Sequence, residues 1–195
     1  MSGSEPLNLK SELQRKLIHI SCTIFPLSYY FFLTREQILF ISCFITAGFL
    51  MAEYLRHRIP LWTNLFKKTF FPLLRDEEKS KGLTGATYLF LSMSITIFVF
   101  DKNIAVPSLL MVTLADSFAA VAGKLTGNLK FFRKSVEGSI TFFLFAIVIL
   151  FIFVPGIGYF NVLIALLLTL IEALPVPVND NILIPVSTGV FLILL

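Results

Sequence analysis

Long apolar runs separated by short polar segments make up most of this 195-residue chain. A helix needs roughly 17 to 25 residues to cross the hydrocarbon core of a bilayer. We therefore predict about seven membrane-spanning helices in one all-α domain that covers residues 1–195. The apolar runs behind this prediction are 17–33, 38–55, 83–100, 104–122, 139–154, 158–174 and 181–195.

A less apolar segment, 56–82, separates the second run from the third. This pattern predicts an amphipathic helix in the cytoplasmic interface of the membrane, with Trp62 at headgroup depth. A helix that packs against the other spans is an equally good interpretation. The apolar residues recur at roughly helical spacing, opposite Lys67 and Lys68: Leu61, Trp62, Leu65, Phe66, Phe70, Phe71, Leu73 and Leu74.

Composition excludes an ordinary soluble domain. Hydrophobic residues make up 56% of the chain, charged residues 14%, and the mean hydropathy is +0.86, whereas about 25% charged residues is typical of a soluble protein. The net charge of +4 does not indicate a nucleic-acid partner, because the basic residues lie in short loops between apolar runs. Cys22 and Cys43 lie in apolar runs without metal-binding spacing, so we expect them to be packing residues.

The distribution of basic residues predicts an orientation in the membrane. With seven spans, 14 of the 16 Lys and Arg residues fall on one side, and only Arg35 and Lys102 fall on the other. The positive-inside rule then places the N-terminus in the cytoplasm. We expect a cytoplasmic (inner) membrane or an ER-type membrane.

Polar residues within the apolar runs gather towards the predicted cytoplasmic side: His19, Glu53, Asp116 and Glu172. A carboxylate at membrane depth costs at least about 2.5 kcal/mol, so it needs a partner or a function. Asp116 is either a metal or substrate ligand or a helix-packing hydrogen-bonder. His19 is either a proton acceptor or a packing histidine. Glu53 either faces a ligand or pairs with Arg56 or Arg15. We therefore expect an active site that faces the cytoplasm.

The segment 123–138 is a candidate nucleotide-binding loop. Gly123 next to Lys124 leaves backbone N–H groups bare for phosphate oxygens, although an ordinary helix-ending loop has the same residues. Further along, a basic cluster precedes a new helix N-terminus, where the helix dipole also favours anions; flanking charges under the positive-inside rule are the alternative. The residues of this second cluster are Arg133, Lys134, Ser135, Glu137 and Gly138.

Carboxylates on the same side predict a magnesium site. Mg²⁺ is usually held by one or two carboxylates together with substrate phosphates. Glu172 and Asp180 add to Asp116 in this respect. An Asx turn ahead of the last helix is an alternative role for Asp180.

Three stretches of the chain resemble the CTP-dependent lipid kinase family, which includes dolichol kinase, phytol kinase and CTP-using diacylglycerol kinase. The longest is ADSFAAVAGKLTGNLKFFRKSVEGS at 115–139; the others are RKLIHI at 15–20 and EALPVPVNDNILIPV at 172–186. The chain is also distantly similar to phosphatidate cytidylyltransferase, which shares an acid–small–glycine–lysine segment followed by Lys-Ser-x-Glu-Gly.

The resemblance implies a polytopic enzyme that takes CTP and Mg²⁺ from the cytoplasm and phosphorylates a lipid hydroxyl. Asp116 or His19 would accept the hydroxyl proton. Metal ligands would be Asp116, Glu172 and Asp180. The nucleotide would contact Gly123, Lys124, Arg133, Lys134, Ser135, Glu137, Gly138 and Asn179, with Arg15, Lys16, Glu53 and Lys81 at the rim.

Several alternatives stay open at this point. The lipid alcohol could be a polyprenol such as dolichol, a phytol-like alcohol or diacylglycerol. A cytidylyltransferase would use the same CTP and Mg²⁺ but attack the α-phosphate and make CDP-diacylglycerol. A small ion-coupled transporter would use Asp116, Glu172 and His19 as a relay, but it predicts polar residues that reach both membrane faces. The oligomeric state is open.

Overall fold

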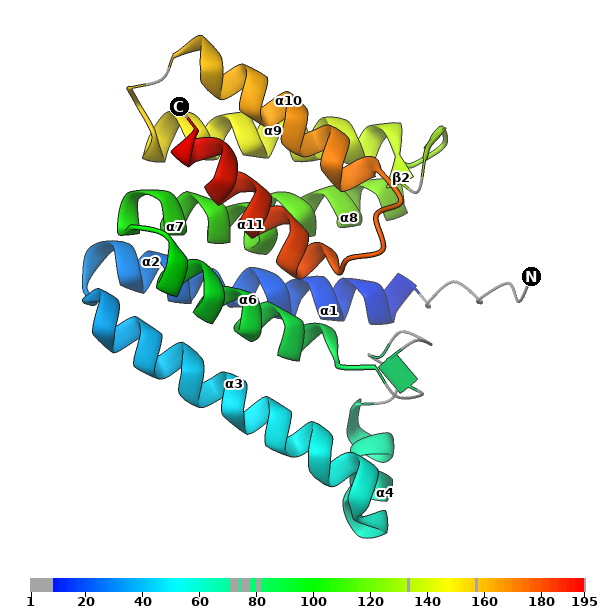
Figure 1. The fold of residues 1–195 in the computed structure, drawn as a ribbon. Helices are drawn as coiled ribbons and strands as arrows, with labels where there is room; N and C mark the ends of the chain where they lie inside the picture. Colours follow the sequence, from blue (N-terminus) through cyan, green and yellow to red (C-terminus); the bar gives the residue numbers. More distant parts are fainter. Residues whose placement is uncertain are drawn as a thin grey trace.

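The computed structural model describes residues 9–70, 74, 78–79, 82–132, 134–156 and 158–194. The described chain is helical apart from one short hairpin, which confirms the all-α prediction (Figure 1). Its helices are α1 (Leu9–Ser21), α2 (Ile24–Phe31), α3 (Arg35–Arg58), α4 (Pro60–Phe70), α6 (Gly85–Val99), α7 (Lys102–Leu110), α8 (Asp116–Leu125), α9 (Val136–Phe153), α10 (Tyr159–Ala173) and α11 (Asp180–Ile193), with a π-helical segment, η2 (Met111–Ala115), between α7 and α8.

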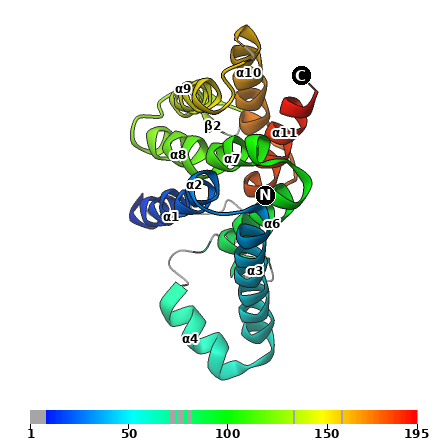
Figure 2. The ribbon, with the colours of Figure 1, turned by 90° about the vertical axis from the view of Figure 1, so that its left-hand side faces the viewer.

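The centre of the molecule is one continuous helix, Lys102–Leu125, formed by α7, η2 and α8. It contacts α1 and α2 on one side and α9 and α11 on the others (Figure 2). Most of its apolar side chains are buried, including Met111, Val112 and Ala115, whereas Phe118 and Leu125 are exposed. A buried helix that meets this many neighbours can hold a polar residue away from lipid, and Asp116 lies directly after the π-helical turn.

The first predicted span, 17–33, is broken into two helices. Around Cys22 and Thr23 the backbone bonds run from residue i to residue i−3: Thr23 N donates to Ile20 O and Phe25 N to Cys22 O. Pro26 has no N–H to donate, and its ring clashes with an α-helical carbonyl four residues earlier. The apolar pattern was continuous here, but the proline divides the helix.

Among the described residues, fewer helices than the seven predicted are long and apolar enough to cross a membrane. Three helices in the described part of the chain are long and apolar enough to cross a membrane: α3, the central helix Lys102–Leu125, and α9. Three shorter apolar helices, α6, α10 and α11, accompany them. The chain is therefore a helical membrane protein, while the count of seven spans and the N-terminal orientation stay predictions.

Helix α4 forms within the predicted interfacial segment. It folds back on the end of α3, where the Trp62 indole N–H donates to Ala52 O at 3.3 Å and the Thr63 hydroxyl donates to Arg56 O. Leu61 and Leu65 are exposed on this helix. Phe71 and Leu73, which the amphipathic pattern also includes, lie outside the described residues.

A small antiparallel hairpin joins α8 to α9, where the sequence predicted only a loop. Its strands are β1 (Lys130–Phe131) and β2 (Lys134–Ser135), with Lys130 opposite Ser135 and Phe131 opposite Lys134. Phe132 in the turn has a φ of 49°. The hairpin fixes the backbone of Lys134 immediately before α9.

Candidate active site

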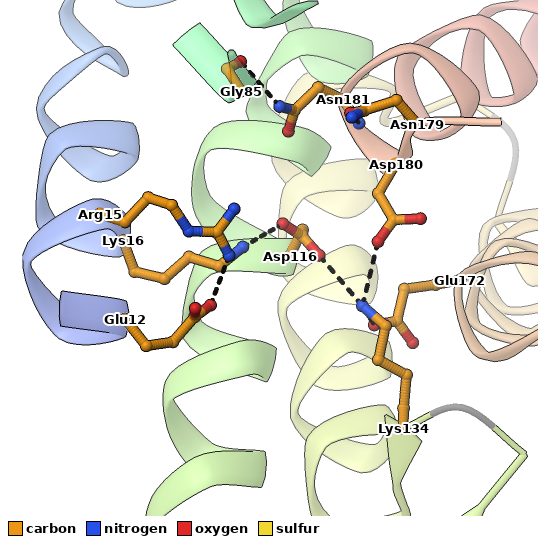
Figure 3. Close-up of polar contacts among 10 residues, drawn as sticks. All are labelled: Glu12, Arg15, Lys16, Gly85, Asp116, Lys134, Glu172, Asn179, Asp180 and Asn181. Carbon is orange, nitrogen blue, oxygen red and sulfur yellow. Dashed lines mark hydrogen bonds and ion pairs between the residues drawn. The ribbon is translucent and has the colours of Figure 1, made fainter. Parts of the chain in front are cut away.

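Asp116 is the centre of a buried ionic cluster. Its side chain is 3% exposed, and its Oδ2 accepts a hydrogen bond from Lys16 Nζ of α1 at 2.5 Å. The Lys16 side chain is 4% exposed, so the charges of this pair are withdrawn from solvent. Figure 3 shows the two side chains reaching each other from α1 and α8. Residues 100 positions apart are thereby joined by one buried ion pair.

Lys134 brings two further carboxylates to the same place. Its Nζ lies 2.7 Å from Glu172 Oε1, 3.4 Å from Asp180 Oδ2 and 3.6 Å from Asp116 Oδ1. These acids come from the end of α10, the start of α11 and the start of α8 (Figure 3). The structure therefore gathers all three predicted metal ligands around one ammonium group.

The charge of Lys134 is strongly stabilised. Burial of the side chain opposes the charged form, but the attraction of Asp116, Glu172 and Asp180 outweighs burial, so the pKa of Lys134 lies well above its ordinary range. The ammonium consequently stays protonated across physiological pH. Two buried oxygens, Asp116 Oδ1 and Glu172 Oε2, still accept no hydrogen bond from the described residues.

Helix α1 supplies the opposite wall of the cluster. Lys16 and His19 are three residues apart, so they lie on one face of the helix, and both are 3% exposed. Arg15 is also buried and binds Glu12 of its own helix. Arg15 and Lys16, predicted at the rim, thus lie inside the protein, and Lys16 is a direct partner of Asp116.

A second polar network lies at the start of α6. Glu53 of α3 pairs with Arg56 at 2.9 Å, and its Oε1 accepts a hydrogen bond from the Thr84 N–H at 2.9 Å. Thr87 donates to the same carboxylate oxygen at 3.4 Å. Of the alternatives for Glu53, the ion pair with Arg56 is confirmed.

Asn181 links this network to the acid cluster. Its side-chain amide donates to Gly85 O at 3.0 Å, at the start of α6. Its backbone N–H donates to Asn179 Oδ1, so Asn179 caps α11 directly before Asp180. The cap fixes the first turn of α11 and, with it, the carboxylate of Asp180.

The predicted loop glycines lie at a close helix contact. A Cβ on Gly123 would lie 2.7 Å from Ser135 Oγ, and one on Gly138 would lie 3.0 Å from Ala119 O. Ser135 Oγ in turn accepts the Gly138 N–H and caps α9. Glycine at both positions is explained by the packing of α8 on α9, and contact with a nucleotide stays a prediction.

The remaining predicted loop residues lie in different places. Glu137 Oε1 accepts the Asn128 N–H at 2.9 Å, which closes the loop between α8 and α9. Lys124 is exposed near the end of α8 and pairs with none of the described acids. Arg133 and Lys81 lie outside the described residues.

The sequence did not predict that Lys16 is the direct partner of Asp116, nor that Asn181 contacts the start of α6. The i, i+3 spacing of Lys16 and His19, which places both on one face of a helix, is the sequence feature that could have indicated the position of Lys16. Nothing in the local sequence paired Asn181 with Gly85, because the two lie 96 positions apart.

The three carboxylates of Asp116, Glu172 and Asp180 surround an ammonium group and not an open metal position. The described residues contain no group of three His, Cys, Asp or Glu side chains arranged around a vacant metal position. The point on which the three carboxylates converge is instead occupied by Lys134 Nζ. Their oxygen donors nevertheless suit Mg²⁺, and two carboxylates are enough when substrate phosphates complete the coordination.

Fold and site together define a helical membrane protein with a buried, mixed-charge polar site built from five elements. No family model and no solved structure matches the chain. The uncharacterized protein RP860 of Rickettsia prowazekii is 30% identical over 185 residues, which cover 90% of each chain. Probable phytol kinase 2 of Glycine max is 26% identical over 92% of this chain and 64% of its own length.

The name of a third relative specifies CTP as the nucleotide. CTP-dependent diacylglycerol kinase 1 of Schizosaccharomyces pombe is 28% identical over 127 residues, which cover 61% of this chain and 55% of the yeast protein. The chain thus spans less than two thirds of the length of these two kinase relatives. Its homologues include phytol kinases and a CTP-dependent diacylglycerol kinase at 26–28% identity, which supports its membership of the CTP-dependent lipid kinase family.

Proposed function

We propose that the protein is a CTP- and Mg²⁺-dependent kinase that transfers the γ-phosphoryl group of CTP to the hydroxyl of a membrane lipid alcohol. The observation that carries this proposal is the convergence of Asp116, Glu172 and Asp180 on Lys134. Phosphoryl transfer depends mainly on positioning and charge neutralisation. A buried site that combines oxygen ligands with ammonium groups provides both.

The acids suit a metal-bound triphosphate. Glu172 Oε2 is buried and accepts no hydrogen bond from the described residues, and Asp116 Oδ1 has only its 3.6 Å ion pair with Lys134. Buried polar atoms in native proteins normally have a hydrogen-bond partner. We assign these two carboxylates, with Asp180, to Mg²⁺. The ion would neutralise negative charge on the donor's phosphates.

The basic residues fall into two groups. Lys16 is fully engaged with Asp116, so we assign it to holding that carboxylate in place. Lys134 is 22% exposed and, with Lys124 and Arg133 of the segment 123–138, is assigned to the phosphates. Both oxygens of Asp116 face ammonium groups. We therefore assign acceptance of the hydroxyl proton to His19, which lies one turn from Lys16.

The names of the relatives favour two classes of acceptor. One relative is named as a phytol kinase and another as a diacylglycerol kinase. Both acceptors are lipid alcohols whose hydroxyl lies at the membrane surface, and a polyprenol has the same chemistry. The site would face the cytoplasm, from which CTP is supplied.

The test is a product assay with purified protein in detergent, Mg²⁺ and CTP labelled in the γ-phosphate. Phytol, a polyprenol and diacylglycerol serve as acceptors, and ATP, GTP and UTP are compared with CTP. We expect two products, a labelled lipid phosphate and CDP. EDTA should abolish the formation of both, and added Mg²⁺ should restore it. Asp116→Asn is the inactive control, with an expected loss of at least about 100-fold.

Two other outcomes would contradict the proposal. Release of pyrophosphate with formation of a CDP-lipid would identify a cytidylyltransferase instead. No phosphorylated product from any of the long-chain alcohols or diacylglycerol, with any nucleotide, would reject the kinase function.

A further inference from the structure

Lys134 occupies the position that a divalent cation needs. Its ammonium is within 3.6 Å of Asp116, Glu172 and Asp180, and no other cation contacts more than one of these acids in the described ion pairs. An ammonium and a metal ion cannot share this point, because both are cations that need the same three carboxylates. Binding of metal at the cluster therefore requires Lys134 to leave.

The charges of the cluster explain why the lysine stays when no ligand is bound. Three carboxylates are opposed by the ammonium groups of Lys16 and Lys134, which leaves a net charge of −1 in a buried site. If Lys134 were absent, the net charge would be −2 and would attract a divalent cation strongly. The lysine thus acts as a built-in competitor.

Lys134 is also the member of the cluster best placed to move. Its side chain is 22% exposed, whereas those of Asp116 and Glu172 are 3% and 1% exposed. It is attached to the short strand β2 rather than to a packed helix, and a lysine carries its charge on a flexible four-carbon stem. The ammonium can therefore swing outwards while the acids keep their positions.

We propose that Lys134 keeps the metal site closed until a nucleotide arrives, and that the phosphates of the donor draw the ammonium out of the acid cluster. Metal and nucleotide then bind together, and free metal is excluded. This inference rests on the proposed function, since it needs a metal-bound triphosphate as the ligand. Beyond the proposed function, it assigns to Lys134 the coupling between metal binding and nucleotide binding.

The coupling can be measured by binding rather than by turnover. Mn²⁺ replaces Mg²⁺ as an electron paramagnetic resonance probe, and purified wild-type protein is titrated with Mn²⁺ in the presence and absence of CTP. We expect free Mn²⁺ to bind roughly 5- to 100-fold more weakly than Mn²⁺ with saturating CTP, and CTP affinity to change by the same factor when Mn²⁺ is added.

The decisive variant is Lys134→Gln, with Lys134→Arg as the charge-retaining comparison and Lys130→Gln, an exposed lysine on the partner strand, as the matched control. Lys134→Gln should bind Mn²⁺ without CTP at least about fivefold more tightly than wild type. The double variant Lys134→Gln/Asp180→Asn should bind Mn²⁺ without CTP more weakly than Lys134→Gln alone. This difference would show that the added affinity comes from the acid cluster. Lys130→Gln should behave as wild type.

The outcomes separate the two proposals. If wild type binds Mn²⁺ with CTP but Lys134→Gln gains no affinity for free Mn²⁺, the inference about Lys134 is rejected and the kinase function stands. If wild type binds Mn²⁺ equally well with and without CTP, the inference is rejected without reference to any variant, so it stays testable even if Lys134→Gln does not fold. If neither protein binds Mn²⁺ under any condition, the proposed function fails as well.

Discussion

At the residue scale, the main feature of this protein is charge buried in complementary pairs. Lys16 and Asp116 are each at most 4% exposed and meet at 2.5 Å. Replacing one member of a buried ion pair leaves an uncompensated charge and costs about 3–5 kcal/mol, whereas replacing both often costs little. The pair is therefore expected to hold α1 against the central helix.

A double-mutant cycle tests this expectation. Lys16→Met and Asp116→Asn should each lower the free energy of unfolding by about 3–5 kcal/mol. The double variant should be more stable than the sum of the two losses predicts, with a coupling of about 0.5–3 kcal/mol. Thermal or denaturant unfolding of the detergent-purified proteins measures these values. Additive losses would show that the two side chains do not interact.

At the element scale, the position of Lys134 depends on how α8 meets α9. The two helices cross where Gly123 and Gly138 face each other: a Cβ on Gly123 would lie 3.6 Å from Gly138 Cα. Ser135 fills the remaining space and caps α9. This contact sets the end of the hairpin, and the hairpin carries Lys134 to the acids.

A substitution at the crossing should therefore act on packing. Gly123→Ala should destabilise the protein by about 1–3 kcal/mol, because the added methyl group overlaps Ser135 Oγ. The loss should be smaller when Gly123→Ala is made in a Ser135→Ala background. Gly48→Ala in α3, where no atom lies within 4 Å of the new methyl group, is the control and should be neutral or stabilising. Equal effects at Gly123 and Gly48 would contradict this explanation.

At the scale of the whole molecule, the polar residues lie at two separate ends of the bundle. The acid cluster lies at the end that contains β2 and the start of α11, whereas α3 and α7 begin at the other end (Figure 1). Arg35 and Lys102, the two basic residues expected on the far side, line one pocket of about 440 Å³ at that other end. This separation agrees with the predicted orientation without establishing it.

Labelling of single cysteines tests the orientation. Lys124→Cys, at the cluster end, should react with a membrane-impermeant maleimide only from the cytoplasmic side. Asn103→Cys, at the start of α7, should react only from the opposite side. The unsubstituted protein measures background labelling: Cys22 is buried, and Cys43 lies in α3, which is long and apolar enough to cross a membrane. The reverse pattern would place the site outside the cytoplasm.

The sequence alone determined most of the helices and several charged residues of the buried cluster. Apolar runs become helices because a buried or lipid-facing backbone must satisfy its own hydrogen bonds, so the predicted run 38–55 appears as α3 and the run 83–100 as α6. Asp116 could be selected as a candidate site residue because an unpaired carboxylate is too costly in an apolar run, and the structure shows it paired with Lys16.

Only the tertiary structure decided which charges meet. Lys16, Asp116, Lys134, Glu172 and Asp180 are spread over 165 positions, and no local pattern encodes their distances. The π-helical turn before Asp116 and the hairpin that carries Lys134 are likewise known only from the structure. The break near Pro26, by contrast, has a local cause in the sequence, the missing N–H of proline. Chain periodicity reports how each segment folds locally, whereas ion pairs form between segments, and their geometry exists only once the helices are packed.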